Sequence, residues 1–326
     1  VGTGHLGNLH AKMYAQIPVA DLVGVYDADS AKAERVAADH GTKAFGNLEQ
    51  LLDSVQAVNI ATTTTAHYDV ALQALERGLH TFIEKPITET IDQAKALVSL
   101  ADAKKLALQV GHIERFNPAI LALEQYRIRP LFIESHRLAQ FNPRGSEVAV
   151  VLDLMIHDID LILSLVRSRV VRIDANGVAV VSGSEDIANA RLQFENGCVA
   201  NVTASRISQN KMRKMRLFQN DAYISIDFSQ GLAEVFRIVD EGDPNIKPTM
   251  MLGKIDQGQR KRVIVYEQPE VKEVNALKYE LELFVKCVTD GTEPPVTGRD
   301  GLQALEVAQE ILKMISESTA RLLKNN

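Results

Sequence analysis

Apolar and polar residues follow two different rhythms along the chain, and the change falls near residue 120. In the first part, short continuous apolar runs alternate with stretches whose apolar positions have helical spacing. The runs predict strands at 22–27, 57–62, 80–85 and 106–112. The stretches between them predict helices at 30–41, 66–78 and 90–105. This alternation indicates a doubly wound parallel sheet with helices on both faces, which is the Rossmann architecture.

The ends of these helices carry recognisable capping residues. Ser30 and Thr90 are expected to be N-caps, because their hydroxyls can accept a hydrogen bond from the first turn. Gly41 and Gly78 are expected at the C-terminal ends, where a left-handed backbone favours glycine.

Beyond residue 120, apolar and polar residues alternate one by one. This pattern predicts an antiparallel sheet with one face buried and the other available for a partner. The predicted strand regions are 129–140, 170–183, 187–206, 212–229, 232–239 and 261–268, with a hairpin turn at 195–197. Helices are predicted at 275–291 and 299–323, and a mobile loop at 241–261.

A chain of 326 residues is longer than one compact core usually holds, so we expect two domains. The change of rhythm places an α/β Rossmann domain at 1–118 and an α+β domain, rich in antiparallel strands, at 119–326. Hydrophobic residues make up 46% of the chain and charged residues 24%, as in ordinary soluble enzymes.

Charge and hydropathy exclude several classes of protein. The net charge of −6 argues against a general nucleic-acid binder, and no apolar run approaches the roughly 20 residues of a membrane span. Cys198 and Cys287 lie far apart and fit neither a disulfide framework nor a metal site. The sequence therefore predicts a cytoplasmic protein with no membrane or nucleic-acid partner and no bound metal.

The first residues, VGTGHLG, place Gly2, Gly4 and Gly7 in the spacing G-x-G-x-x-G, with His5 and Leu6 inside the same turn. Such glycines let the backbone approach a pyrophosphate at the start of a helix. The motif lacks the preceding strand that it requires, so we expect the native chain to carry an apolar segment of about 4–6 residues upstream.

Asp27 lies 20 residues after Gly7, at the end of the strand predicted at 22–27. A carboxylate there accepts hydrogen bonds from the adenosine ribose and repels a 2′-phosphate, which favours NAD over NADP. The alternative is that the glycines form only a tight turn and that Asp27 is a solvated residue at a strand end.

Two further motifs follow strands of the first domain. Thr62, Thr63 and Thr64 can present hydroxyls to the cofactor, with His67 at the start of the next helix; simple N-capping is the alternative. Glu84-Lys85-Pro86 ends an apolar strand, and Pro86 restricts Lys85 to an extended backbone. Lys85 is expected to point into the crevice and bind a substrate oxygen, although a lone lysine at a strand end is usually a solvated charge.

In the second domain, Asp153, His157 and Asp160 lie at i, i+4 and i+7 of a predicted apolar helix and share one of its faces. Buried polar groups must be paired, so one interpretation is a structural network around His157. The other makes His157 a proton acceptor that Asp153 orients. A metal site formed by the three residues is a third alternative.

In this order, the motifs resemble the Gfo/Idh/MocA family of NAD(P)-dependent oxidoreductases. The resemblance rests on Gly2-x-Gly4-x-x-Gly7, Asp27, the threonine-rich turn ending in His67, Glu84-Lys85-Pro86, Asp153-x-x-x-His157 and the closing segment 281–311. It implies an NAD-binding domain at 1–118 and, at 119–326, a substrate-binding domain with a large open sheet. That sheet is expected to pair copies of the chain into a homodimer or homotetramer.

The resemblance also implies a reaction and site residues. A hydride passes from a sugar or cyclitol carbon to nicotinamide, with His157 as the base, Lys85 on the reacting oxygen and Asp153 beside the histidine. Glu84 and His67 are then expected near the cofactor.

VGHIERFNPAI (110–120) and DLMIHDIDLIL (153–163) narrow the resemblance to the branch that oxidises the 3-hydroxyl of UDP-linked N-acetylhexosamines. In that branch, Arg115, Asn117 and Asp160 are candidate substrate contacts. Arg137, Arg144 and Arg206 can bind a diphosphate, and surface charge or a salt bridge is the alternative for each arginine.

Two other functions stay open on the sequence. One is a dehydrogenase of an unlinked sugar or an inositol-type polyol. The other is a regulator that senses NAD or a sugar without catalysis, although the presence of both Lys85 and His157 speaks against it.

Overall fold

The computed structural model describes residues 1–142, 148–242, 249–257 and 260–324. The chain forms two compact units, one of residues 1–116 with 275–306 and the other of residues 117–274 with 307–326. The predicted boundary after residue 118 lies close to residue 116, where the chain first passes from one unit to the other. Residues 275–306, however, were expected in the second domain and pack with the first unit.

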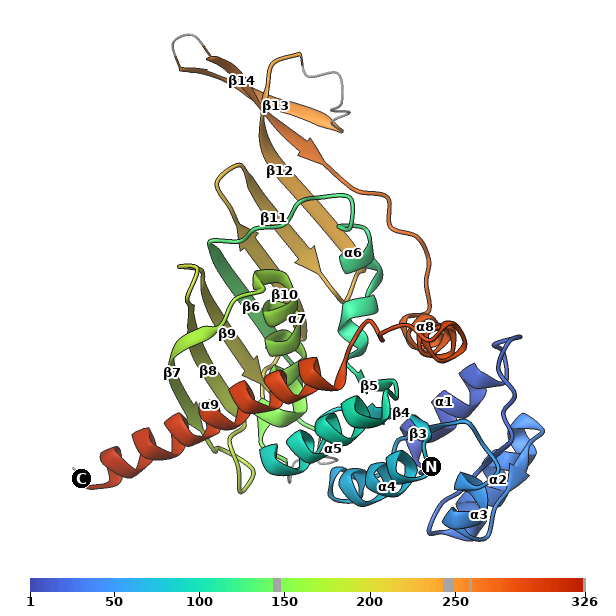
Figure 1. Ribbon diagram of the computed structural model, residues 1–326. Coiled ribbons are helices and arrows are strands. Elements are labelled where there is room, and N and C mark those ends of the chain that lie inside the picture. Colours follow the sequence, from blue (N-terminus) through green and yellow to red (C-terminus); the bar gives the residue numbers. More distant parts are fainter. Residues whose placement is uncertain (143–147, 243–248, 258–259, 325–326) are drawn as a thin grey trace. The chain divides into compact units, whose positions relative to one another are not determined.

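The first unit contains two parallel sheets flanked by helices (Figure 1). Its strands are β1 (Gly24–Val25), β2 (Lys43–Ala44), β3 (Ala57–Ile60), β4 (His80–Glu84) and β5 (Leu108–Gly111), in the orders β1-β2 and β3-β4-β5. Its helices are α1 (His5–Tyr14), α2 (Ser30–His40), α3 (Leu48–Leu52), α4 (Thr64–Glu76), α5 (Ile91–Lys104), the short turn η1 (Ile113–Phe116) and α8 (Ala276–Asp290). The Rossmann prediction is confirmed, although β2 and α3 are too short to have been recognised by periodicity.

Val1 and Gly2 connect the two sheets of this unit. The Gly2 amide donates to the carbonyl of Tyr26, just after β1, at 2.8 Å. The Val1 amino group donates to the Asn59 carbonyl in β3 at 2.7 Å, and the Ala61 amide donates to the Val1 carbonyl at 2.9 Å. The glycine-rich turn therefore begins between the carboxyl ends of β1 and β3.

The central strands are covered on both faces, as their continuous apolar sequences predict. All four residues of β5 are buried, and Phe82 of β4 packs with Met13, Ile17, Leu281 and Phe284. The contact between the rings of Phe82 and Phe284 is edge-to-face, with centroids 5.7 Å apart. Helices α1 and α8 thus cover the strand that leads to Lys85.

Most of the predicted caps are confirmed. Thr90 forms a capping box with Gln93, and Gly41 adopts the left-handed conformation with φ +65°. Ser30 is not the N-cap of α2, because the neighbouring Asp29 accepts the hydrogen bond from the Lys32 amide at 3.3 Å. Aspartate and serine cap about equally well, so adjacent candidates cannot be ranked by type alone.

The second unit is built on a nine-stranded sheet, with α7 (Ile156–Val166) against its middle strands (Figure 1). The strand order is β13-β14-β12-β11-β10-β6-β9-β8-β7. The strands are β6 (Phe132–Leu138), β7 (Val170–Val178), β8 (Ile187–Phe194), β9 (Val199–Ser205), β10 (Met212–Phe218), β11 (Ala222–Asp227), β12 (Leu232–Asp240), β13 (Met250–Gln257) and β14 (Arg260–Glu267). Among the described strand pairs of this sheet, the central β6–β9 pair alone is parallel, so the predicted, mostly antiparallel sheet is confirmed.

The other described helices of this unit are α6 (Pro118–Leu121) and the π-helical turn η2 (Val151–Met155). Helix α9 (Gly298–Lys324) begins in the first unit and ends in the second. No described helix is long and apolar enough to cross a membrane.

The prediction of a loop over 241–261 is wrong for residues 250–257, which form β13. This strand pairs with β14, and a register shift between Met251 and Gly253 interrupts its alternation. A strand with such an irregularity has no period-two pattern to detect, since its existence depends on the partner strand. Residues 243–248 and 258–259 of the predicted loop lie outside the described residues.

The two faces of the sheet differ in burial. On β6, Ile133, Ser135 and Arg137 are buried on the face that contacts α7. The opposite face carries a row of aromatic side chains with neighbouring ring centroids 5.0 to 5.7 Å apart. The row consists of Phe132, Phe218, Tyr223, Phe236 and Tyr266.

Candidate active site

The glycine-rich turn has the form that a dinucleotide requires. Gly2 has φ +82°, and a Cβ at Gly7 would lie 1.8 Å from the carbonyl oxygen of Gly2. These two glycines therefore allow the turn to close. Gly4 is exposed and has open space where a Cβ would project, directly before the first turn of α1. That opening, with His5 and Leu6 also exposed, lets phosphates approach the N-terminus of α1.

Asp27 is tied to this turn. Its Oδ2 accepts hydrogen bonds from the Thr3 amide at 2.6 Å and the Thr3 hydroxyl at 3.0 Å, and its Oδ1 accepts one from the Asp29 amide at 2.9 Å. Partial burial raises the pKa of Asp27, but these hydrogen bonds outweigh it and hold the pKa below its usual value. The residue is therefore a carboxylate beside the glycine-rich turn.

The threonine-rich turn after β3 is joined to the turn after β4 by His67. This histidine is 1% exposed, with Nδ1 2.9 Å from the Pro86 carbonyl and Nε2 3.3 Å from the Thr62 carbonyl. Burial lowers its pKa, so the ring stays neutral. Thr63 occupies the N-cap of α4 without a side-chain capping bond, which does not support simple N-capping as the role of its hydroxyl. Thr64 is the first residue of the helix.

Lys85 directly follows β4 and is half-buried. Its amide donates to Glu84 Oε2 at 3.2 Å, and the Lys85–Pro86 peptide is cis. Burial raises the pKa of Glu84, but the hydrogen bond from His10 and the charges of His10 and Lys85 outweigh it and lower the pKa overall. Glu84 is therefore ionised beside the backbone of Lys85.

His10 and Asn59 belong to the same cluster and were missed in the sequence. His10 Nε2 lies 2.8 Å from Glu84 Oε1, and His10 Nδ1 lies 3.0 Å from Asn59 Oδ1. His10 could have been recognised as a site residue because it is a polar side chain on the otherwise apolar face of α1, three residues after Gly7. A buried polar residue at such a position needs a partner.

In the second unit, the predicted helix at 151–163 is not one regular helix. Asp153 lies in the π-helical turn η2, and His157 lies in the first turn of α7. Both are half-buried, whereas Asp160 is 1% exposed. π-Helical turns are frequent at functional sites, and their extra residue cannot be read from an apolar repeat.

Asp158, which follows His157, anchors this helix to the sheet. It accepts hydrogen bonds from Ser135 at 2.7 Å and from Arg137 Nε at 2.5 Å, and all three side chains are buried. Arg137, considered above as a diphosphate ligand, thus forms a buried ion pair, as its structural alternative predicts. The pair fixes α7, and with it His157, against β6.

The remaining predicted substrate residues make contacts within their own units. Arg115 lies 3.3 Å from Asp300, and Asn117 caps α6 by accepting from the Ala119 amide at 3.1 Å. Arg206 is 5% exposed, donates to the Val148 carbonyl and lies 4.0 Å from Asp186. Arg144 lies outside the described residues. A role of these residues in substrate binding stays a prediction.

The structure gives no support to the alternative that Asp153, His157 and Asp160 bind a metal ion. In the part of the chain that the structure describes, no group of three or more His, Cys, Asp or Glu side chains is arranged to hold a metal ion.

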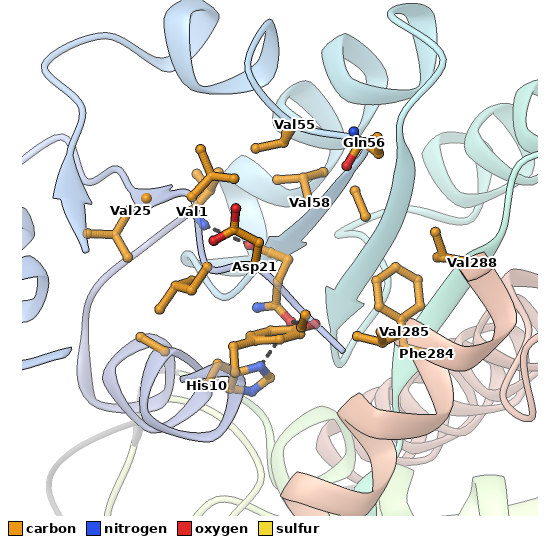
Figure 2. Close-up of a pocket in the computed structure, with 18 of the residues that line it drawn as sticks. Val1, His10, Asp21, Val25, Val55, Gln56, Val58, Phe284, Val285 and Val288 are labelled. Carbon is orange, nitrogen blue, oxygen red and sulfur yellow. Dashed lines mark hydrogen bonds between the residues drawn. The ribbon is translucent and has the colours of Figure 1, made fainter. Parts of the chain in front are cut away.

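A pocket of the first unit opens between β1 and β3 (Figure 2). Its lining is largely apolar and includes Val25, Val58 and Phe284, with His10 at its boundary. Asp27, Thr62 and Lys85 are not among the lining residues. Gly2 and Gly7 of the glycine-rich turn do line it, so the pocket reaches that turn but includes neither Asp27 nor the turns that follow β3 and β4.

Comparison with known proteins shows to which family a chain with this glycine-rich turn, Glu84-Lys85-Pro86 and Asp153-x-x-x-His157 belongs. The model of an oxidoreductase family with an NAD-binding Rossmann fold matches residues 1–112, and that of the GFO/IDH/MocA C-terminal domain matches residues 131–233. UDP-N-acetylglucosamine 3-dehydrogenase of Acidithiobacillus ferrooxidans is 42% identical over 237 residues, which cover 72% of this chain and 75% of that protein. The chain belongs to the Gfo/Idh/MocA family. It is an NAD-dependent oxidoreductase, as its glycine-rich turn and Asp27 predict.

Similarity to known dehydrogenases extends over nearly the whole chain. Scyllo-inositol 2-dehydrogenase (NAD(+)) of Bacillus subtilis is 27% identical, and the match covers 94% of this chain and 90% of that protein. A solved structure of the A. ferrooxidans UDP-N-acetylglucosamine 3-dehydrogenase has a TM-score of 0.86 at 35% identity, covering 96% of this chain and 95% of that one. A levoglucosan dehydrogenase, solved with NADH and levoglucosan, shares the fold with a TM-score of 0.81 at 20% identity, over 97% and 96% of the two chains.

Proposed function

We propose that this protein oxidises the 3-hydroxyl of a UDP-linked N-acetylhexosamine with NAD. The observation that carries the proposal is the similarity to UDP-N-acetylglucosamine 3-dehydrogenase, 42% in sequence over 237 residues and extending in structure over 96% of the chain. The second support is chemical, since Lys85, Asp153 and His157 together supply the groups that oxidation of an alcohol needs.

The first unit holds the cofactor in this proposal. The Asp27 carboxylate accepts from the ribose hydroxyls, and the open turn at Gly4, with His5 and Leu6, receives the pyrophosphate. Thr62, Thr63 and Thr64 line the approach to the nicotinamide end, while His67 and Glu84 position the turns around it. NAD, when bound, accepts the hydride from the carbon that bears the reacting hydroxyl.

The proton of that hydroxyl needs an acceptor. His157 takes it, since an imidazole titrates near neutral pH, and Asp153 orients the ring. Lys85 donates a hydrogen bond to the reacting oxygen and stabilises the negative charge that develops as the proton leaves. Arg115, Asn117, Asp160, Arg144 and Arg206 stay candidates for contacts with the sugar and diphosphate.

Formation of NADH tests the substrate. The proposal predicts rapid NADH absorbance with UDP-N-acetylglucosamine and NAD, and loss of that activity when N-acetylglucosamine replaces the UDP-sugar. Equal or better turnover of inositols would instead identify a polyol dehydrogenase, a second candidate that the relation to scyllo-inositol 2-dehydrogenase favours. Absence of turnover with every sugar and polyol, with NAD still bound, would indicate a sensor.

We also infer that a second copy of the chain packs on the aromatic face of the nine-stranded sheet, giving a homodimer or homotetramer. The row from Phe132 to Tyr266 supports this, because it presents apolar rings on the face opposite α7. Replacing Phe218 by Lys is expected to reduce the mass in solution to that of a single chain.

We also infer a cytoplasmic setting, which the buried free cysteines Cys198 and Cys287 support.

A further inference from the structure

A buried histidine links the helix of the glycine-rich turn to the backbone of Lys85. His10, on α1, is 2% exposed and contacts Glu84 Oε1 at 2.8 Å. The other oxygen of Glu84 accepts from the Lys85 amide at 3.2 Å. On its far side, His10 contacts the Asn59 side-chain oxygen at 3.0 Å. The cluster thus connects α1, β3 and the end of β4.

We propose that His10 is a positioning residue for Lys85, acting through the Glu84 carboxylate. The inference rests on the proposed role of Lys85 at the reacting oxygen. It assigns a function to a residue that makes its contacts inside the first unit and belongs to none of the motifs described above.

Hydrogen-bond chemistry fixes the direction of the link. A carboxylate only accepts, so His10 Nε2 must donate to Oε1 while the Lys85 amide donates to Oε2. Each oxygen of Glu84 therefore holds one donor. Charge-assisted bonds of this kind are stronger than neutral ones, and the burial of the cluster strengthens them further.

The carboxylate also has little room to move. Glu84 is paired in register with Gly111 of β5, and a Cβ at Gly111 would lie 3.0 Å from the carboxyl carbon and Oε2 of Glu84. Gly111 thus leaves the space that the carboxylate fills. With β5 on one side and His10 on another, the carboxylate holds the Lys85 amide in one place.

Packing alone does not require a histidine here. The His10 ring meets the edge of Phe82, with centroids 5.6 Å apart, and an apolar side chain could fill the same space. Such a side chain would leave Oε1 of the ionised Glu84, a carboxylate only 12% exposed, without the donor that His10 supplies, which is unfavourable. The geometry thus assigns the imidazole to the carboxylate rather than to the core.

Two substitutions separate the two contacts of His10. The amide nitrogen of Gln can occupy the place of Nε2 and keep the donor to Glu84, whereas that of Asn occupies the place of Nδ1 and keeps only the contact with Asn59. We expect His10→Asn to lower kcat about 10- to 100-fold with little change in the Kd of NAD, because small misplacement of a reacting group has effects of this size. His10→Gln should restore most of the activity.

His80→Gln is the matched control. His80 lies at the other end of β4, and its Nδ1 accepts from the Ala107 amide at 2.9 Å. The control should leave kcat unchanged. If Asn and Gln at position 10 reduce kcat equally, or if Gln is the worse, His10 acts through Asn59 or through packing and the proposal is wrong.

A second variant and a second measurement keep the test independent of folding and of the substrate. Glu84→Gln leaves one oxygen for two donors, so it should lower kcat as His10→Asn does. Hydrogen exchange of the Lys85 amide should be faster in His10→Asn and Glu84→Gln than in His10→Gln or the wild type. Unchanged exchange in both would refute the positioning role, whereas faster exchange without turnover of any UDP-sugar by the wild type would refute only the proposed function.

Discussion

The His67 imidazole lies 2.9 Å from the carbonyl oxygen of Pro86, so a buried ring in α4 holds the residue that follows Lys85. The same ring lies 3.3 Å from the Thr62 carbonyl. These contacts tie together the two turns at the carboxyl ends of β3 and β4. A contact of His67 with the cofactor stays a prediction.

Replacing His67 by Phe keeps the volume and removes both polar contacts. We expect the free energy of unfolding to fall by about 1–3 kcal/mol, since the carbonyl that accepts the single N–H of the neutral ring loses its donor, and kcat/KM to fall about tenfold as the turns move. Urea unfolding and steady-state kinetics measure the two effects. His40→Phe, at the half-buried end of α2, is the control. An unaltered kcat/KM in His67→Phe would show that His67 does not hold the turns that follow β3 and β4.

The ion pair of Asp158 and Arg137 should be essential to the stability of the second unit. Replacing Asp158 by Ala leaves the Arg137 guanidinium buried without its carboxylate, which typically costs about 3–5 kcal/mol. The exposed pair of Arg172 and Asp174 provides the comparison, and Asp174→Ala should change stability by less than about 1 kcal/mol. Equal losses in the two variants, measured by urea unfolding, would show that the buried pair has no special role.

Asp186 makes stability depend on pH. Burial raises its pKa, but hydrogen bonds from Ser182 and from the amides of Val181 and Val180 outweigh it and hold the pKa far below the usual value. A group with a lowered folded-state pKa stabilises the protein above its unfolded pKa of about 3.9, and that contribution is lost as pH falls toward the folded pKa.

The comparison with Asp186→Asn isolates this contribution. The wild type should be the more stable protein at pH 7, and its advantage in melting temperature should narrow steadily below about pH 4. An advantage that stays constant from pH 7 to pH 3 would mean that the charge of Asp186 is not responsible.

Asp27 should determine the choice of cofactor. Its ionised carboxylate is proposed to face the ribose and to repel a 2′-phosphate, so Asp27→Ser should weaken NAD binding and reduce the preference for NAD over NADP about 10- to 100-fold. Titration of the protein with each cofactor measures the ratio. A preference that survives the substitution would place the discrimination elsewhere in the turn after β1.

Sequence patterns predict the elements of this molecule that leave a local pattern of apolar residues or glycines. Continuous apolar runs identify β3, β4 and β5 because both faces of these strands are buried, and glycine spacing identifies the turn before α1. The missed strand β13 depends on pairing with β14 and on a bulge, neither of which leaves a local pattern.

The candidate site shows the same division. The residues that are proposed to carry the chemistry follow from motifs, because the spacing of a motif is local; they are Asp27, Lys85 and His157. The residues that hold them do not, since His10 reaches Glu84 across 74 positions of the chain and Arg137 reaches Asp158 across 21. Long-range partners of this kind are specified by the fold and not by a neighbouring residue.

The central claim is that Lys85 and His157 act together on a nucleotide-sugar hydroxyl. Its most direct test is the rate of NADH formation with UDP-N-acetylglucosamine and NAD in the wild type, Lys85→Ala and His157→Ala, with the Kd of NAD measured for each. We predict turnover in the wild type and its loss in both variants, with NAD affinity retained. Full activity in either variant, or no NADH from the wild type, would contradict the claim.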